Sequence, residues 1–281
     1  MNRLSTEKRA QIIGMMVEGV SIRSISRLTG ASKNTIVKLL ADAGQACLDY
    51  QDKTFHNLSC KRLQLDEIWS FVGMKEKNVP GHLKGNGAVG DVWTWTAIDA
   101  DTKLIPSWMV GDRSGDTASA FVCDLAKRLA GRVQLTTDGL KAYVEAVEKG
   151  FGKDVDYATL VKLYGHTTEG QKRYSPAHIV GIERVCCTGK PDPKHISTSY
   201  VERSNLSIRM GLRRFTRLTN AFSKKIENHV YALSIYFMYY NFCRIHQTIR
   251  VTPAMAAGVS DHVWELEELI GLLNDTARKA A

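Results

Sequence analysis

Three acidic residues, far apart in the sequence, lie in patterns that could support metal chemistry. Asp66 lies inside the apolar stretch 63–71, Asp138 closes the apolar stretch 133–137, and Glu202 lies in the arginine-rich segment 200–209. The intervals of about 72 and 64 residues are long enough for all three to meet at one end of a sheet. Carboxylates gathered there would suit a pair of Mg²⁺ ions, or Mn²⁺, acting on a phosphodiester.

The residues around these acids leave other roles open. In an extended strand Asp66 and Glu67 point to opposite faces, so only one can face a metal pocket, and the other would serve a salt bridge or solvent. Asp66 could also be a charge that protects an edge strand. Asp138 precedes Gly139 and a predicted helix, where an N-cap aspartate is common.

Glu202 stands at the start of a strongly basic segment. On a helical wheel an apolar stripe through Val201 and Ile208 lies beside a polar face that carries Glu202, Asn205 and Arg209. From residue 203 to residue 225 there is no acid, and seven residues are basic: Arg203, Arg209, Arg213, Arg214, Arg217, Lys224 and Lys225. A solvated basic face is the ordinary explanation of such a run, and phosphate binding is the alternative.

The overall charge favours a polyanionic partner. The 281 residues include 38 Lys+Arg against 29 Asp+Glu, which gives a formal net charge of +9. Membrane surfaces and acidic proteins attract the same excess, so charge alone does not select nucleic acid. The sequence has no apolar run of about 18 residues and no signal-peptide core at its N-terminus, so we expect a cytoplasmic, nucleoid-associated protein.

The six cysteines form no Cys-x-x-Cys pair, and we expect them to be reduced thiols. A metal site that joins Cys186 or Cys187 to His178 or His195 is an alternative. It is disfavoured because adjacent cysteines rarely supply tetrahedral ligands together.

The N-terminal part, residues 1–48, reads as three short helices. The pattern of helix, turn with Gly30, and helix matches a helix-turn-helix, whose second helix enters the major groove of DNA. A small helical bundle with a solvated third helix is the alternative. Five polar residues at the start of that helix are predicted to contact DNA: Ser32, Lys33, Asn34, Thr35 and Lys38.

A polar stretch, residues 49–61, is predicted to be a linker to a domain over residues 62–250. Strands are expected at 62–72, 91–99, 103–110 and 133–137, with helices at 117–130 and 139–149. Residues 155–164 form either a fifth strand or a helix. We therefore predict an α/β domain with a mixed five-stranded sheet flanked by helices, an insertion at 165–198 with room for one hairpin, and a helical tail at 251–281.

Several longer motifs resemble one known family. The stretches Asp66-Glu-Ile-Trp-Ser-Phe-Val72, Thr137-Asp-Gly139, Tyr200-Val-Glu-Arg-Ser-Asn-Leu206 and Tyr240-Asn-Phe-Cys-Arg-Ile-His246 are similar to those of DDE transposases of the bacterial insertion sequence one family. The resemblance covers about residues 60–258 and implies an RNase H-like catalytic fold. Many members carry a cysteine zinc module ahead of the helix-turn-helix. This chain starts at the latter, which leaves the recognition of element ends open.

The resemblance also implies roles for individual residues. Asp66, Asp138 and Glu202 would be the catalytic and metal-binding triad, supported by Arg203, Asn205 and Arg209, with His246 and Arg250 as an accessory pair. Asp66 would bridge two Mg²⁺ ions, water would cut the DNA at the element's end, and the freed 3′-OH would attack target DNA. Double-stranded DNA is the expected partner, bound by a homodimer or a larger assembly. A nuclease without strand transfer and a non-catalytic repressor are the alternatives.

Overall fold

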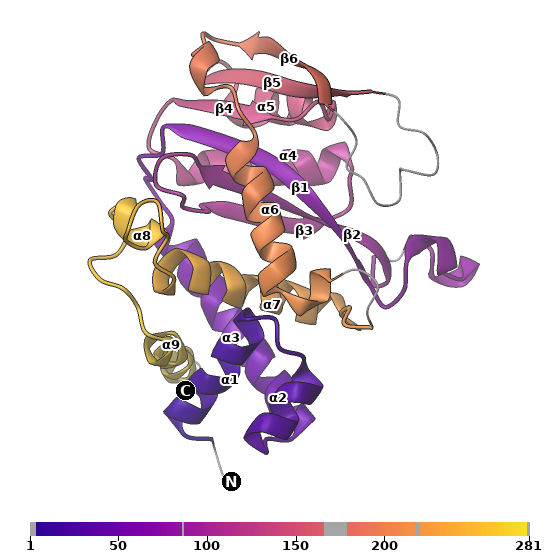
Figure 1. Cartoon of the computed structure of the whole chain (residues 1–281), viewed down its shortest axis with the longest axis vertical. Coiled ribbons are helices and arrows are strands. Elements are labelled where there is room, and N and C mark those ends of the chain that lie inside the picture. Colours follow the sequence, from indigo (N-terminus) through magenta and orange to yellow (C-terminus); the bar gives the residue numbers. More distant parts are fainter. Residues whose placement is uncertain (1–3, 86, 166–178, 217–219, 280–281) are drawn as a thin grey trace.

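A six-stranded mixed sheet forms the centre of the molecule (Figure 1). The computed structural model describes residues 4–85, 87–165, 179–216 and 220–279. The strand order is β3-β2-β1-β4-β5-β6, in which β1 runs antiparallel to β2 and parallel to β4. Pair β4–β5 is parallel, and pairs β2–β3 and β5–β6 are antiparallel. The strands are β1 (Arg62–Val72), β2 (Gly90–Asp99), β3 (Ser107–Gly111), β4 (Val133–Thr137), β5 (Val155–Tyr164) and β6 (Ile179–Thr188).

The sixth strand differs from the prediction of five. Residues 155–164 form strand β5, and β6 lies within the segment predicted to be an insertion, where it pairs with β5 at the edge of the sheet. Nearly all side chains of β6 are exposed. A strand that buries neither face has no alternation of apolar and polar residues, so sequence periodicity could not reveal it.

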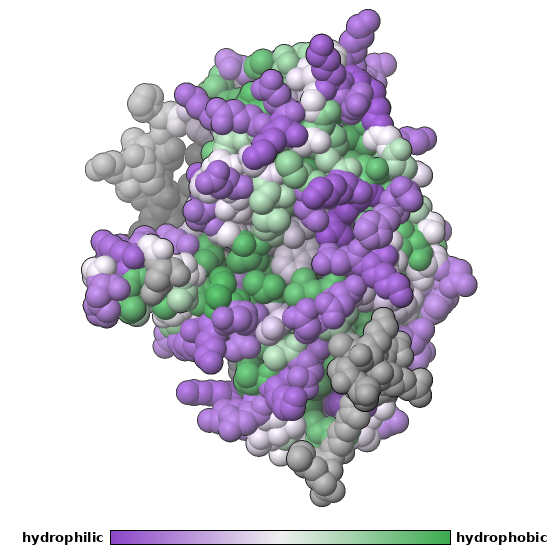
Figure 2. Space-filling model, turned by 180° about the vertical axis from the view of Figure 1, so that it is seen from behind, coloured by the Kyte–Doolittle hydropathy of each residue, from purple (hydrophilic) through white to green (hydrophobic). Residues whose placement is uncertain are grey.

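Helices cover both faces of the sheet. Figure 1 shows α6 (Ser199–Gly211) in front of the sheet and α4 (Gly115–Arg128) with α5 (Ala142–Phe151) behind it. Helix α4 begins after Ser114, whose hydroxyl accepts from Thr117 N at 3.2 Å, and it buries Phe121 against Trp95 of β2. The rear face is largely hydrophilic, and hydrophobic residues gather there beside the protruding segment 76–83, which holds the 3₁₀ turns η1 (Glu76–Asn78) and η2 (Gly81–Leu83) (Figure 2).

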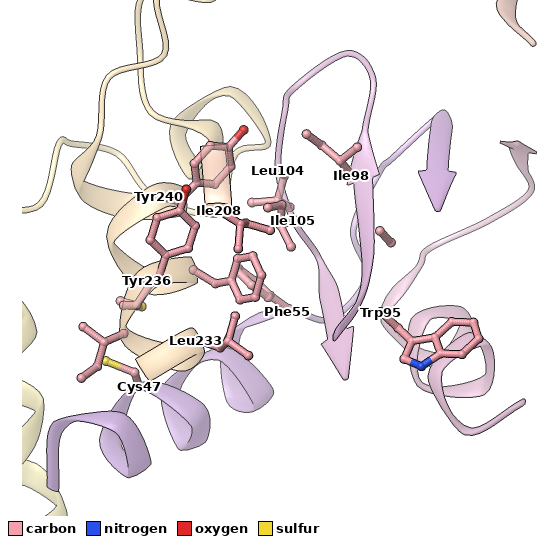
Figure 3. Packing of buried hydrophobic residues seen from close by; sticks show 14 of the residues in the cluster. Cys47, Phe55, Trp95, Ile98, Leu104, Ile105, Ile208, Leu233, Tyr236 and Tyr240 are labelled. Carbon is pink, nitrogen blue, oxygen red and sulfur yellow. The ribbon is translucent and has the colours of Figure 1, made fainter. Parts of the chain in front are cut away.

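The N-terminal helices share one hydrophobic core with the sheet. Helices α1 (Thr6–Val17) and α2 (Ile22–Thr29) form where predicted, and α3 (Lys33–Thr54) starts where predicted; each is capped by a serine hydroxyl. Figure 3 shows Cys47 of α3 beside Leu233 of α7 (Ile226–Met238), with Ile105 and Ile208 in the same cluster. The three-helix unit is therefore packed against the rest of the chain.

The linker predicted at residues 49–61 is wrong in its first half, because α3 continues to Thr54. The polar composition of this stretch predicted a solvent-exposed linker, although one face of the helix is buried. Gln51 is buried, and its Nε2 donates to Cys47 O at 3.0 Å and to Ser234 O at 3.3 Å. Tyr50 packs edge-on against Phe242 with ring centroids 5.6 Å apart. Further along the stretch, Leu58 forms a bridge to Leu129, and Lys61 O accepts from Gln134 N of β4 at 2.9 Å.

The C-terminal tail completes this packing. Helix α8 (Pro253–Ala256) starts after Thr252, whose hydroxyl accepts from Met255 N at 3.2 Å. Helix α9 (Leu266–Lys279) packs against α1 and α3 and buries Leu269 and Ile270. Among the described residues no helix is both long and apolar enough to cross a membrane.

The crossing of α3 and α7 is close enough to require glycine at residue 44. A Cβ added there would lie 2.3 Å from Cβ of Tyr231. Gly→Ala usually stabilises a helix interior by about 1 kcal/mol, but here we expect Gly44→Ala to lower the free energy of unfolding by about 1–3 kcal/mol because the helices must separate. Urea denaturation measures the change. Gly271→Ala in α9, where nothing lies within 4 Å, is the matched control and should be neutral or stabilising. Equal stability of both variants would contradict the close crossing.

Candidate active site

The register of the sheet brings Asp66 next to Asp138. The parallel pair β1–β4 aligns Gln64 with Thr136, so two residues further along both strands Asp66 comes beside Asp138. Oxygen atoms from Asp66, Glu67 and Asp138 all lie within 4.8 Å of one another. Asp138 also accepts from Leu140 N at 2.9 Å, so it orders the turn after β4 while its carboxylate remains at the end of the sheet.

Glu67 is anchored on the other face of β1. Its Oε1 lies 2.7 Å from Nη2 and 2.8 Å from Nε of Arg113, and its Oε2 accepts from the Tyr143 hydroxyl at 3.1 Å. Arg113 in turn lies over the ring of Trp93, 4.7 Å from its centroid. These donors take up Oε1 and one lone pair of Oε2, so Glu67 has less capacity left for a metal than Asp66 has. Of the two adjacent acids, Glu67 therefore makes the salt bridge that the sequence left open, and Asp66 remains available as a ligand.

Glu202 does not join this cluster in the described structure. Its Oε1 accepts from the Thr198 hydroxyl at 2.7 Å and forms an ion pair with Lys162 of β5. The carboxylate is still near enough to Asp66 to raise the pKa of that residue. The three acids predicted from sequence are thus neighbours, but only Asp66 and Asp138 meet directly, and the third member of the compact cluster is Glu67. Sequence gave no signal for Lys162, because a lone lysine near the end of a strand has no distinctive pattern.

Asn205 holds the carboxylate of Asp66 in place. One helical turn after Glu202, its Nδ2 donates to Asp66 Oδ2 at 2.8 Å. The side chain is buried, and its Oδ1 has no hydrogen-bond partner. Asn205 was predicted both to support the triad and to contact DNA. The buried contact with Asp66 agrees with the first role and leaves no surface for the second.

Negative charge at this site is only partly compensated by the protein. Burial and the neighbouring Glu67 raise the pKa of Asp66 to about 7, and Asp138 and Glu202 add to the shift. Burial and Asp138 likewise raise the pKa of Glu67, although Arg113 opposes the change. An all-oxygen donor set, two adjacent acids (Asp66 and Asp138) that no described cation pairs with, and an orphaned carbonyl oxygen on Asn205 together fit a hard divalent ion such as Mg²⁺ or Mn²⁺.

The basic segment after Glu202 is not one continuous helix. Helix α6 ends at Gly211, a 3₁₀ turn (η4, Arg213–Phe215) follows, and α7 starts at Ile226. Arg203, Arg213, Lys224 and Lys225 are exposed, whereas Arg209 and Arg214 are partly buried. Arg217 lies outside the described residues.

The residues proposed to read DNA at the start of α3 are all exposed. Ser32 caps the helix by accepting from Thr35 N at 3.2 Å, and Lys33 and Asn34 lie beside it in the first turn. Lys38 pairs with Asp42 at 2.8 Å. Their side chains are therefore accessible to a ligand.

The accessory pair predicted at His246 and Arg250 is held in a tight turn. Arg250 N donates to His246 O at 2.8 Å, and Arg250 has a φ of 60°. No hydrogen bond or ion pair of the described residues joins either side chain to Asp66, Glu67 or Asp138, and His246 Nδ1 accepts from Thr248 N at 3.3 Å. The cysteines are free thiols, His195 contacts Arg62, and His178 lies outside the described residues.

Comparisons with known proteins add little to this geometry. No family model matches the chain, and no curated protein matches it. A cryo-EM structure of piggyBac transposase in a synaptic complex with hairpin DNA is similar over 99% of this chain and 73% of that chain, with 12% sequence identity and a TM-score of 0.42. A TM-score that low does not establish a common fold, so the function has to follow from the chain's own residues.

Proposed function

We propose that this chain is a DNA transposase that cuts and joins DNA strands by a metal-dependent DDE mechanism. The observation that carries the proposal is the meeting of Asp66 and Asp138 at the carboxyl end of β4, beside helix α6, from which Asn205 donates to Asp66 and on which Glu202 lies nearby. The motifs shared with the insertion sequence one family contain these same four residues. A net charge of +9 agrees with a DNA partner.

The domain assignment follows from this proposal. Strands β3-β2-β1-β4-β5, with β6 added at the edge, would form the RNase H-like catalytic domain within residues 62–250. Residues 1–48 would be a helix-turn-helix that binds the element ends, and residues 251–281 a helical tail. Because two ends must be held together during transfer, at least a dimer is expected.

Asp66 and Asp138 would hold the metal ions, and Glu202 would complete the ligand set after it leaves Lys162. Bound there, divalent ions would lower the pKa of the attacking water and neutralise charge on the phosphoryl group. Asn205 fixes the carboxylate of Asp66 through its Nδ2. Glu67, held by Arg113 and Tyr143, keeps β1 in position from the opposite face. Arg203 and Arg209 on α6 would hold the DNA backbone.

The direct test incubates purified protein with a labelled duplex that carries an element end and with a target plasmid, in Mg²⁺ or in EDTA. We expect cleaved ends and strand-transfer products only with Mg²⁺. Cleaved ends without joined products would indicate a nuclease that shares the site. Binding without cleavage would indicate a repressor.

Lys162 offers a test of the metal site that needs no DNA. In the metal-free protein its ammonium group competes with a metal ion for Glu202. Removing an ion pair of this exposure is worth up to about 1 kcal/mol, so Lys162→Met should tighten Mn²⁺ binding by about threefold to fivefold. Isothermal titration calorimetry measures the affinity. Lys149→Met, an exposed lysine on α5, is the control and should leave it unchanged. Weaker Mn²⁺ binding in Lys162→Met than in wild type would contradict the proposal that Glu202 leaves Lys162 to bind the metal.

A further inference from the structure

A cavity of about 780 Å³ lies between the N-terminal helices and the segment that follows α6. Its wall is mainly apolar and includes Val17 and Val20 from the end of α1 and Leu212 from the end of α6. Phe222 also lines it, anchored by Phe71 of β1 with ring centroids 4.7 Å apart. The cavity is large enough for a ligand with a flat apolar body.

Every charged residue that lines this cavity is basic. They are Arg23, Arg213, Arg214, Lys224 and Lys225, and the lining contains no acid in the part of the chain that the structure describes. Burial and the charge of Arg23 lower the pKa of Lys224. Like charges around a hollow repel one another, and an anionic ligand would relieve the repulsion.

Arg214 is the most enclosed of these cations and is held by a polar network. Its Nη1 donates to the Ser223 hydroxyl at 2.8 Å. Ser223 Oγ lies 3.2 Å from Nδ1 of His229, whose Nε2 lies 3.2 Å from Oγ of Ser70 on β1. Burial lowers the pKa of His229 to about 3, so its ring is neutral. The network therefore fixes the guanidinium without neutralising it.

The charge of Arg214 is costly in this position. Burial alone lowers its pKa to about 10, and no described carboxylate pairs with it. A guanidinium carries five N–H donors in a planar fork that matches a phosphate. Among the residues that the structure describes, one of these donors is used, in the contact to Ser223. A phosphate bound at Arg214 would supply the missing negative charge.

The apolar wall of the cavity favours a ligand that has an apolar part as well as a negative charge. An inorganic anion would bind the basic side chains but make no contact with the apolar wall. A paired duplex keeps its bases inside the stack, so its bases could not reach the wall. A nucleotide in a single strand offers both parts, a phosphate for Arg214 and a base for the apolar wall. The base would pack against the aliphatic side chains and take the place of the Lys224 ammonium group, which lies over the ring of Phe222, 3.2 Å from its centroid.

We propose that this cavity binds an unpaired nucleotide of the DNA, with its phosphate on Arg214 and its base against the wall formed by Val20 and Phe222. The proposal rests on the DNA-binding function above and specifies the form of DNA that the chain prefers. The site would hold a strand that has separated from its partner at the end of a duplex.

Fluorescence anisotropy in EDTA tests this without cleavage. The wild-type protein should bind a duplex with a three-nucleotide unpaired tail about tenfold more tightly than the blunt duplex, because stacking one base contributes on that scale. Arg214→Gln should remove most of this preference while its affinity for the blunt duplex falls by less than about threefold. Arg203→Gln, an exposed arginine on α6 outside the cavity, makes the same charge change and should weaken both duplexes equally.

A second measurement detects whether the unpaired base stacks in the cavity. With 2-aminopurine at the first unpaired position, binding to the wild type should change its fluorescence, and Phe222→Ala should abolish the change while thermal melting confirms that the variant is folded. Equal affinity for both duplexes, or a fluorescence change that survives in Phe222→Ala and Arg214→Gln, would overturn the inference. Failure to bind either duplex would instead contradict the DNA-binding function itself.

Discussion

Asp66→Asn is expected to lower Mg²⁺-dependent strand cleavage by about 10³-fold or more and to leave the binding of end-containing DNA within about twofold of wild type. The substitution removes the carboxylate that faces Asp138 and is held by Asn205, while it keeps the size and most contacts of the side chain. Cleavage of a labelled duplex and a mobility-shift assay measure the two quantities. Retained Mg²⁺-dependent cleavage would remove Asp66 from the site.

The same substitution should make the metal-free protein more stable near neutral pH. The pKa of Asp66 in the folded protein is about 7, above its ordinary value of 3.8. When the pKa of a carboxyl is higher in the folded protein than in the unfolded chain, the group stabilises the folded protein at pH values below its pKa in the unfolded chain. This stabilisation is lost as the pH rises toward 7. An amide at residue 66 is not ionised, and the unpartnered Oδ1 of Asn205 can accept from it.

At pH 8 in EDTA we therefore expect Asp66→Asn to melt about 5 °C higher than wild type, because its free energy of unfolding rises by on the order of 2 kcal/mol. At pH 4 the two proteins should melt at the same temperature. Saturating Mg²⁺ should reverse the order, because the ions stabilise only the protein that binds them. Glu148→Gln, at an exposed position on α5, is the control and should melt like wild type under all three conditions.

A comparison of Glu202→Gln with Glu67→Gln distinguishes the two candidates for the third acid. Glu202→Gln should lower cleavage by about 10²-fold to 10³-fold with little change in stability, since its pair with Lys162 is partly exposed. Glu67→Gln should lower the free energy of unfolding by about 1–3 kcal/mol. The side chain is only 2% exposed, and the loss of its charge-assisted bonds to Arg113 should outweigh the relief of the repulsion that raises the pKa of Glu67.

At a temperature where both variants are folded, Glu67→Gln should keep more than about a tenth of the cleavage rate and nearly normal Mn²⁺ affinity. Calorimetric titration measures the Mn²⁺ affinity of each variant, and single-turnover cleavage measures its rate. Together they identify which acid is the third metal ligand. The reverse pattern, with Glu67→Gln inactive and Glu202→Gln active, would make Glu67 the third ligand and leave Glu202 as a surface partner of Lys162.

Much of the arrangement around Asp66 and Asp138 could be predicted from sequence. Asp66 lies within an apolar stretch of strand length and Asp138 closes another, so parallel pairing of the two strands can bring the two acids side by side. The opposite orientation of Glu67 followed from the two-residue period of a strand. The position of Asp66 beside Asp138 and the direction of Glu67 depend only on the geometry of strands and of their pairing, so they could be predicted from the sequence.

The conformation of Glu202 and the sixth strand could not be predicted in the same way. Which cation pairs with Glu202 depends on the distance between α6 and β5, and their contacting residues Glu202 and Lys162 are 40 positions apart. Strand β6 has no buried face to impose a pattern. The helical continuation of α3 to Thr54 was hidden because its buried face includes the polar Gln51, which is satisfied by carbonyl groups of Cys47 and Ser234.

Helix α3 runs from the surface proposed to read DNA into the hydrophobic core shared with α7 and the sheet. Its first turn carries the exposed residues proposed to enter the major groove, and its middle is locked against α7 at Gly44. With 22 residues the helix is about 33 Å long. Under the proposed function, the length of this helix would set the number of base pairs between the DNA sequence contacted by the first turn and the bond cut at the acidic site.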